Sequence, residues 1–415
     1  MDMRHEFDDW NQKSLTHEEL LGDSGGRASA FTFLCIVVIL TSLGLVMLYS
    51  ASYNEALIHD LPHYYFFQRQ LMFVVLALVC SVFIRFVPFS WIRHMVVPLL
   101  VLCLVLMLMT LFTHFGQEKL GSKRWVEIGP LPSLQPSELV KIGSILFLAS
   151  YYKKDRSGQG TIKPMIIPFF VVMGFTLLIL MQKDYSTTIL YLGICVTLFL
   201  VGGMKISYLL LMLAFLAVPG VAVMLSEPYR VKRVFSFIFS NLDPSGINYQ
   251  VTNSLKAIGE GGMFGVGLGN GVYKLGLIPE VQSDFIFASV CEEIGFVGAG
   301  FILVLFSMLA ILGYNTYYRM LNRDRFLSYT AFGITTMILA QAFVNIAVVT
   351  GLLPPTGIPL PFFSQGGTNL FVILCCCALL YRIMLISSGR ILLEKSKLPK
   401  KERQEILFPQ EQEMS

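Results

Sequence analysis

Long apolar runs recur along the whole chain, and they constrain its fold more than any other feature. A helix of about 20 apolar residues is long enough to cross the hydrocarbon core of a bilayer. The 415-residue sequence is 55% hydrophobic and only 14% charged, whereas a soluble domain carries about 25% charged residues. The sequence therefore predicts an all-α polytopic membrane protein and argues against a soluble enzyme or binding module.

Ten membrane spans can be read from these runs, at residues 28–51, 66–86, 90–113, 137–152, 164–182, 185–203, 206–226, 285–313, 326–350 and 369–388. Of the 31 Lys and Arg residues, 20 fall in segments that a cytoplasmic N-terminus would place inside the cell. Basic residues favour the cytoplasmic side, so this excess predicts that both termini are cytoplasmic. No signal peptide is expected, because residues 1–27 are polar and lack an apolar run with a cleavage site.

The spans divide the chain into a cytoplasmic N-terminal segment (1–27), a membrane domain (28–388) and a basic cytoplasmic tail (389–415). Three stretches are expected on the outer side of the membrane, at 114–136, 227–284 and 351–368. A connection as long as 227–284, between spans seven and eight, is rare unless it is functional. The tail is expected to touch anionic lipid, and no nucleic-acid site is expected.

Three carboxylates lie where the long outer stretch runs into the eighth span, in the part QSDFIFASVCEEIG of the sequence LIPEVQSDFIFASVCEEIG. They are Asp284, Glu292 and Glu293. A charged side chain at the bilayer centre costs about 2.5–3.5 kcal/mol on insertion scales, so these acids need partners or water. Two interpretations of Asp284 stay open from the residues alone. It is a reactive group at the outer surface, or Ser283 or Asp284 is the N-cap of the next helix.

Other ionisable residues are expected near the same outer face. Glu138 and Lys141 lie three residues apart at the start of span four, so they form part of a site or a local ion pair that helps the span to enter the membrane. Asp184 in QKDYST is functional or is the N-cap of span six. Cations beside an acid fit a lipid diphosphate substrate, because basic side chains neutralise the leaving diphosphate while a carboxylate accepts the proton of an attacking hydroxyl.

Cysteines and glycines do not indicate a further site. All eight cysteines lie in apolar segments without a CxxC pair, so core positions are expected rather than disulfides or metal ligands. The stretch GEGGMFGVGLGNG lacks the preceding strand and the glycine spacing of a dinucleotide-binding loop. Its glycines are expected to allow close backbone approach or turns with positive φ.

The chain resembles the SEDS family (shape, elongation, division and sporulation) in five blocks that occur in the family's order. They are LGSKRWVEIGPLPSLQPSELVKIG, EPYRVKRVFSF with DPSGINYQ, AIGEGGMFGVGLGNG, PEVQSDFIFASVCEEIGFVG and GLLPPTGIPLPFFSQGGTNL. The resemblance covers about 28–390. The EPYRVKR start of the large loop and the polar N-terminal extension are more similar to the division members than to the elongation members.

The resemblance implies a ten-span peptidoglycan glycosyltransferase that polymerises lipid II into β-1,4-linked glycan at the outer leaflet of the cytoplasmic membrane. The implied transfer is inverting, with glycan linked to undecaprenyl diphosphate as donor. The implied partners are a class B penicillin-binding protein and other proteins of the division machinery, at the septum. Three alternatives stay open: a lipid II flippase, an elongation-type polymerase, and a scaffold of the division machinery.

The resemblance also implies roles for individual residues. The family's essential loop aspartate matches Asp284, which is expected to be the general base. Its arginine before tryptophan matches Arg124 and its span-four lysine matches Lys141; with Arg230 or Arg233 they are expected to steady the diphosphate. Further candidate substrate-binding residues are Glu138, Asp184, Gln250 and Ser364. A Mg²⁺ or Mn²⁺ ion could share that load, although the sequence forms no closed metal site.

The two glutamates inside span eight receive a different interpretation. Glu292 and Glu293 are expected to face the interior of the helix bundle near cations such as Lys141, and to have a structural role. The family patterns are altered at Asn253 and Gln365, and both replacements keep a hydrogen-bonding side chain. The resemblance therefore implies the family's chemistry with changed details of substrate contact.

Overall fold

The structure is a computed structural model, and it describes residues 24–119, 122–127, 133–152, 163–207, 210, 214 and 248–388. The first half of this described part contains α3 (Ser24–Ile58), α4 (Tyr65–Phe86), α5 (Phe89–Phe112), β1 (Gly116–Lys119), β2 (Ser122–Val126), α6 (Pro136–Tyr152), α7 (Lys163–Met181) and α8 (Tyr185–Val201). The second half contains α11 (Tyr249–Gly261), α12 (Ile286–Leu321), α13 (Arg325–Val349) and α14 (Gly367–Ser387).

Six of the described helices are long and apolar enough to cross a membrane: α3 from Ala28 onward, α4, α5, α12, α13 and α14. They lie on predicted spans one, two, three, eight, nine and ten, while α6, α7 and α8 lie on spans four, five and six. The predicted helical membrane fold is therefore confirmed. Most of predicted span seven, the start of the large loop with Arg230 and Arg233, and the tail 389–415 lie outside the described residues.

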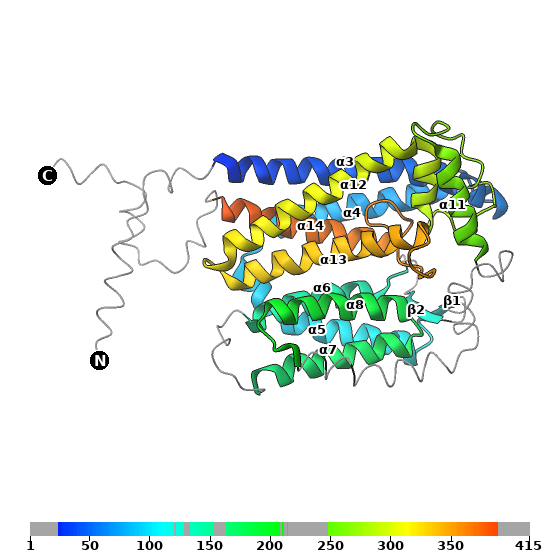
Figure 1. Ribbon diagram of the computed structural model, residues 1–415. Helices are drawn as coiled ribbons and strands as arrows, with labels where there is room; N and C mark the ends of the chain where they lie inside the picture. Colours follow the sequence, from blue (N-terminus) through cyan, green and yellow to red (C-terminus); the bar gives the residue numbers. More distant parts are fainter. Residues whose placement is uncertain are drawn as a thin grey trace, which may run out of the picture.

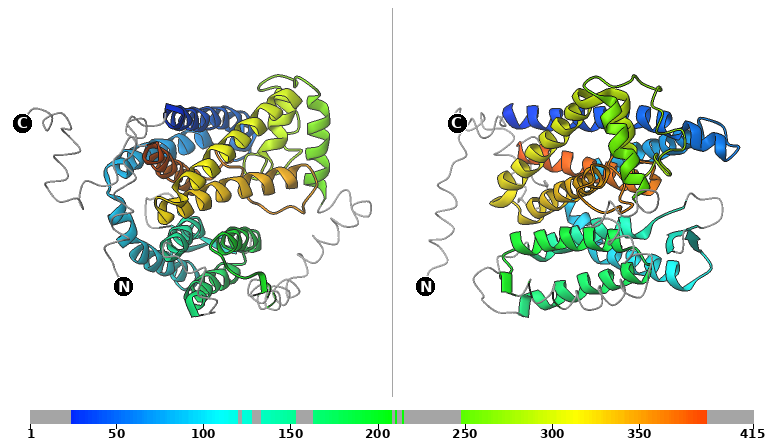
Figure 2. Two further views of the ribbon diagram at one scale, coloured as in Figure 1. Left: turned by 60° about the vertical axis from the view of Figure 1, so that its left-hand side comes forward. Right: turned by 45° about the vertical axis from the view of Figure 1, so that its right-hand side comes forward.

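The helices form two groups that lie side by side (Figures 1 and 2). One group contains α3, α4, α12, α13 and α14, and the other contains α5 to α8. α13 joins the groups because it packs against both α6 and α8. The shared apolar core includes Leu40 of α3, Leu148 of α6, Tyr191 of α8 and Ile334 of α13, all fully buried.

The outward faces of α4 and α5 are apolar and exposed. Leu78 and Phe83 of α4 are 60% and 66% exposed, and Trp91 and Val97 of α5 are 62% and 63% exposed. A soluble protein rarely exposes a contiguous apolar surface of this kind. These faces are therefore suited to contact with lipid hydrocarbon.

One end of the bundle gathers most of the described non-helical structure, as Figure 1 shows. The β1–β2 hairpin, α11 with the glycine-rich stretch that follows it, and the loop 350–366 all lie there, while the start of α3 and the end of α14 lie at the opposite end. We call the first of these the outer end. The hairpin was not predicted; it pairs Gly116 with Val126 and Gln117 with Trp125, and it carries Arg124.

The loop 350–366 enters the bundle from the outer end. Ile358, Leu360, Phe362 and Phe363 are each less than 5% exposed. The backbone of the loop approaches α3 so closely that a Cβ at Gly44 would lie 2.1 Å from the carbonyl oxygen of Phe362. Non-helical backbone at membrane depth is tolerated where protein covers it, and here it brings Gly357 and Ser364 into the region of Asp284.

Candidate active site at the outer end

Asp284 lies in the turn before α12, where contacts hold its backbone and its carboxylate. Its carbonyl oxygen accepts a hydrogen bond from Nδ2 of Asn345 on α13 at 2.8 Å, and its Oδ1 accepts one from the Ser283 hydroxyl at 3.0 Å. Its Oδ2 lies over Gly357, where an added Cβ would come within 3.2 Å. The side chain is only half-buried, so the carboxylate is positioned and still accessible.

The start of α12 decides between the two interpretations of Asp284. The helix begins at Ile286, its N-cap is Phe285, and no side chain caps it. The interpretation of Ser283 or Asp284 as the N-cap is therefore wrong. Asp284 is therefore held in place by contacts other than a helix cap.

Asp184 is the N-cap of α8, and its carboxylate also pairs with Arg124. Its Oδ1 accepts from the N–H of Thr187 at 3.2 Å, so the capping interpretation is confirmed. Its Oδ2 lies 3.6 Å from Nε of Arg124 and 3.5 Å from Nε2 of Gln135. The Arg124 side chain is 27% exposed and donates to the Lys183 carbonyl at 3.2 Å, so the hairpin presents an accessible guanidinium that a cap carboxylate orients.

Glu138 and Lys141 form a buried ion pair on α6, with Nζ 2.8 Å from Oε2 and exposed fractions of 4% and 1%. The same Glu138 oxygen accepts from Nδ2 of Asn369 on α14 at 2.8 Å. This Nδ2 also lies 3.4 Å from Oε1 of Gln341 on α13. The local ion pair that the spacing predicted is present. It links α6 to α14, and its ammonium is held in the bundle interior.

The start of α14 and the loop before it connect these groups. Thr368 accepts from the N–H of Gln135 at 3.3 Å, and Gln135 in turn contacts Asp184. On the other side, the N–H of Gln365 donates to the Gln282 carbonyl at 2.8 Å, two residues before Asp284. One segment therefore contacts the turn of Asp284 and the polar cluster around Arg124 and Asp184.

The remaining predicted binding residues support loops in this structure. Nε2 of Gln250 on α11 donates to the Pro279 carbonyl at 3.3 Å. The Ser364 hydroxyl accepts from the N–H of Leu360 at 2.8 Å, and the Ser364 carbonyl accepts from Nε2 of Gln70 at 3.0 Å. Ser364 is buried, so its contacts shape the loop 350–366 from inside.

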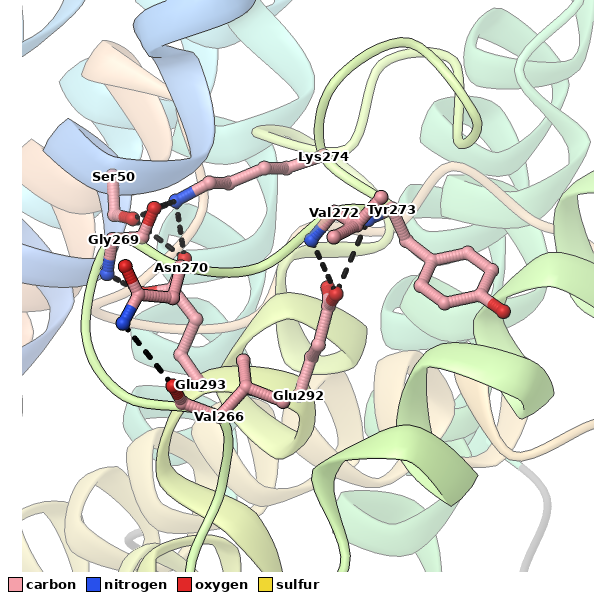
Figure 3. Close-up of polar contacts among 9 residues, drawn as sticks. All are labelled: Ser50, Val266, Gly269, Asn270, Val272, Tyr273, Lys274, Glu292 and Glu293. Atoms are coloured by element: carbon pink, nitrogen blue, oxygen red, sulfur yellow. Dashed lines mark hydrogen bonds and ion pairs between the residues drawn. The ribbon is translucent and has the colours of Figure 1, made fainter.

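Glu293 forms a second buried ion pair, with Lys274 (Figure 3). Its Oε1 lies 2.5 Å from Nζ of Lys274, and the two side chains are 0% and 6% exposed. The Ser50 hydroxyl of α3 donates to the same oxygen at 2.6 Å, and the N–H of Gly269 donates to Oε2 at 2.9 Å. Lys274 also donates to the Ser50 hydroxyl at 2.7 Å. This contact joins α3, α12 and the loop between α11 and α12.

Glu292 is held by the backbone of the same loop. Its Oε1 accepts from the N–H groups of Val272 and Tyr273, at 2.5 and 3.2 Å. Both glutamates face the protein interior, as predicted, but Lys141 as their cationic neighbour was wrong. Lys274 has that role, and the sequence reasoning missed it because no helical or motif spacing relates it to Glu293.

The glycine-rich stretch 259–271 allows this loop to pack directly on α12. The N–H of Val266 donates to the Glu292 carbonyl at 2.9 Å, and a Cβ at Gly265 would lie 2.2 Å from the Glu293 carbonyl oxygen. α12 itself is interrupted at Gly295, where φ is 68°. The expectation of close backbone approach is therefore confirmed, and its purpose here is to enclose the two buried glutamates.

No metal cluster accompanies these groups in the described part of the chain, since no three His, Cys, Asp or Glu residues there are arranged to hold an ion. The eight cysteines are free thiols. The described residues place an accessible carboxylate, Asp284, at the same end of the bundle as an accessible guanidinium, Arg124.

Residues 31–388 match the model of the cell cycle protein family named for FtsW, RodA and SpoVE. The chain belongs to this family. Stage V sporulation protein E of Bacillus subtilis is 36% identical to this chain, over 84% of this chain and 94% of the relative. Two further relatives are named probable peptidoglycan glycosyltransferase FtsW. The one from Borreliella burgdorferi is 36% identical to this chain, over 85% of this chain and 95% of the relative. The one from Legionella pneumophila is 33% identical, over 82% of this chain and 87% of the relative.

Solved structures of similar proteins agree with the fold of this FtsW/RodA/SpoVE family member. One solved structure is of a peptidoglycan synthase complex and concerns the structural coordination of polymerization and crosslinking. A chain of that structure is 25% identical to this chain and has a TM-score of 0.69, and the match covers 89% of this chain and 99% of that one. The rod shape determining protein RodA of Thermus thermophilus has a TM-score of 0.61 at 24% identity, over 88% and 97%. The helical architecture is therefore that of the family.

The Lys274–Glu293 pair generates a stability prediction. Lys274→Met leaves a buried carboxylate without its cation, and breaking a buried pair in this way costs about 3–5 kcal/mol. We expect a clearly lower melting temperature for the purified protein in detergent. Lys256→Met, at an exposed lysine on α11, is the matched control and should change stability by no more than about 0.5 kcal/mol. Equal melting of the two variants would show that the ion pair does not stabilise the outer end.

Proposed function

We propose that this chain is a peptidoglycan glycosyltransferase of the cytoplasmic membrane that polymerises lipid II into β-1,4-linked glycan for the division septum. The activity is supported by two relatives that are named probable peptidoglycan glycosyltransferase. They are 33–36% identical to this chain over more than four-fifths of its length. The observation that carries the mechanism is the accessible Asp284 carboxylate at the outer end, which accepts a hydrogen bond from Ser283 and whose backbone carbonyl accepts one from Asn345. The outer end is where a lipid diphosphate in the outer leaflet would present its sugar.

In the proposed reaction, the sugar 4-hydroxyl of one lipid II attacks the anomeric carbon of a second lipid II or of a growing strand. The new glycosidic bond forms as the bond to the undecaprenyl diphosphate breaks, with inversion at that carbon. Asp284 accepts the hydroxyl proton, and the diphosphate leaves with the bonding electron pair. A positioned general base of this kind contributes about 10²–10⁴-fold to a rate.

The leaving diphosphate requires positive charge beside it. Arg124 is the described candidate, because its guanidinium is accessible and the Asp184 carboxylate orients it. Arg230 and Arg233 are proposed to add charge from the large loop. Lys141 and Glu138 are proposed to act from inside the bundle by bracing α14, while Gln250 and Ser364 keep the loops of the site in shape. A Mg²⁺ or Mn²⁺ ion, if bound, would supply further positive charge for the leaving diphosphate.

We propose ten spans, with the N-terminal segment 1–27 and the tail 389–415 cytoplasmic. The stretches 114–136, 227–284 and 351–368 then lie on the outer side. Two observations support this topology. The described connections alternate between the two ends of the bundle, with residues 59–64 at the outer end and 322–324 at the opposite end. The sequence also has 20 of its 31 Lys and Arg residues in the segments that this topology makes cytoplasmic, as the positive-inside rule requires.

Labelling of introduced cysteines tests the topology. Asp60→Cys at the outer end should react with a membrane-impermeant thiol reagent in intact cells, and Asn322→Cys at the opposite end should react only after the membrane is opened. Both positions are exposed turn residues, and the unaltered chain measures the background from its eight native cysteines. Labelling at position 322 without labelling at position 60 would invert the topology and remove the outer site.

The proposed partner is a class B penicillin-binding protein, which crosslinks the glycan, within the division machinery. Its support is the similarity to a chain of a peptidoglycan synthase complex in which polymerization and crosslinking are coordinated. The division role, rather than elongation, is supported by the relatives named FtsW. No described feature specifically favours a lipid II flippase.

Substitution of Asp284 tests the chemistry. Asp284→Asn keeps the size of the side chain but removes the basic oxygen, so polymer formation from labelled lipid II should fall by about 10²–10⁴-fold. The melting temperature should be unchanged, because the side chain does not cap α12. Asp60→Asn, at an exposed aspartate of the same end, is the matched control and should keep normal turnover. Normal turnover by Asp284→Asn would remove the general-base role.

A further inference from the structure

The loop that leaves α11, residues 262–278, carries an exposed apolar surface. Phe264 is 81% exposed, more than any other large apolar side chain of the described residues. The other exposed apolar residues of the loop are Met263, Val266, Leu268, Val272, Leu275 and Leu277. Lys274 is the one charged residue in the loop, and its side chain is buried in the pair with Glu293. An exposed apolar surface without charge marks contact with a membrane or with another protein.

The backbone of this loop is hydrogen-bonded within the protein. Glu292 and Glu293 accept, through their carbonyls and their carboxylates, from the N–H groups of Val266, Gly267, Gly269, Val272 and Tyr273. Asn270, the exposed polar residue of the loop, donates from its side chain to the Val266 carbonyl at 3.2 Å. Most N–H groups from Gly265 to Leu275 therefore have protein acceptors. Such a backbone is suited to contact with lipid, where a polar group cannot bond to water.

The apolar surface of the loop continues directly into that of α12. The N–H groups of Phe296 and Val297 donate to the carbonyls of Gly262 and Met263, at 2.9 and 3.1 Å. From there one exposed apolar stripe follows α12, because its members are three or four positions apart and share a face. They are Val297, Phe301, Val304, Met308 and Ile311. α12 is long and apolar enough to cross a membrane, so the stripe is suited to face lipid and the loop extends it.

The length of α12 indicates how deep the loop lies. Tyr318, on the same stripe near the far end of the helix, is exposed, and tyrosine is enriched at membrane–water interfaces. From Tyr318 to Val297 the helix rises by about 32 Å at about 1.5 Å per residue. The hydrocarbon core is about 30 Å thick. With Tyr318 at one interface, Val297 and the loop residues bonded to it lie at the other.

We propose that the loop 262–278 inserts its exposed apolar side chains, Phe264 and Leu268 among them, into the outer leaflet, where they contact lipid acyl chains. The buried glutamates and Lys274 hold the loop in shape, and α12 places it at the depth where the hydrocarbon begins. Insertion does not require glycosyltransferase activity, so its failure would leave the proposed function standing. The alternative cover for this surface is a soluble domain of a partner protein, and the two give opposite results below.

The experiment measures tryptophan fluorescence of the full-length protein in vesicles of phosphatidylcholine and phosphatidylglycerol. Bromine atoms on the acyl chains quench a tryptophan only at short range. Phe264→Trp and Leu268→Trp each add one tryptophan to the loop, and the unaltered chain, with three tryptophans, gives the background. We expect most of the added emission to be lost when the bromines lie near the headgroups, and less of it when they lie near the bilayer centre.

Two control variants set the limits of the measurement. Val304→Trp, on the lipid-facing stripe of α12, should lose its added emission to bromines deeper in the chains. Glu118→Trp, at an exposed position of β1 at the outer end, should keep its added emission with brominated lipid and lose it to iodide in the water. The melting temperature of each variant shows whether it is folded, and the two loop positions are measured separately.

Loss of the added emission to bromine at either loop position supports insertion. The inference is overturned if both loop tryptophans behave like Glu118→Trp, unaffected by brominated lipid and quenched by aqueous iodide. The surface would then face water in the isolated protein and be left for the soluble domain of a partner.

Discussion

The buried ion pair between Lys274 and Glu293 is the contact on which the outer end of this protein depends. A carboxylate with no exposed surface is stable only if its charge is balanced and its oxygens are hydrogen-bonded. Lys274 supplies the charge, and Ser50 and Gly269 supply further donors. Because these groups come from α3, α12 and the loop between α11 and α12, satisfying one acid also fixes the loop that leads to Asp284.

The three carboxylates of residues 284–293 thus have different environments. Glu292 and Glu293 follow the start of α12 into the interior, where backbone N–H groups and Lys274 neutralise them. Asp284 precedes the helix and remains half-buried, with its backbone tied to α13. The two buried acids fix the loop residues 269–274, and Asp284 remains accessible. In a membrane protein this division lets one segment carry three charges without exposing them to lipid.

The features that could be predicted from sequence are those set by short-range spacing or by long apolar runs. The helices follow the runs, the pair Glu138–Lys141 follows from a separation of three residues, and the cap of α8 by Asp184 follows from its place before the helix. The N-cap question at Asp284 could not be decided, because it depends on whether α12 begins one residue earlier or later.

Long-range contacts could not be predicted in the same way. Ser50 and Glu293 meet across 243 residues of sequence, and Lys274 lies on a glycine-rich loop without a periodic pattern. Nor did apolar residues such as Phe363 indicate that the loop 350–366 enters the bundle, because an apolar loop residue is equally compatible with a membrane surface. The contacts that orient Asp284 are therefore tertiary ones, and the fold was needed to find them.

This membrane domain is proposed to join sugars itself, at its outer end. Incubation of the purified chain in detergent with labelled lipid II, together with the proposed class B penicillin-binding protein, tests this directly. Detergent has no second compartment, so transport cannot contribute. We expect a ladder of glycan strands that a muramidase degrades. Folded protein that forms no polymer, but moves lipid II between the leaflets of a vesicle, would contradict the account and identify a transporter instead.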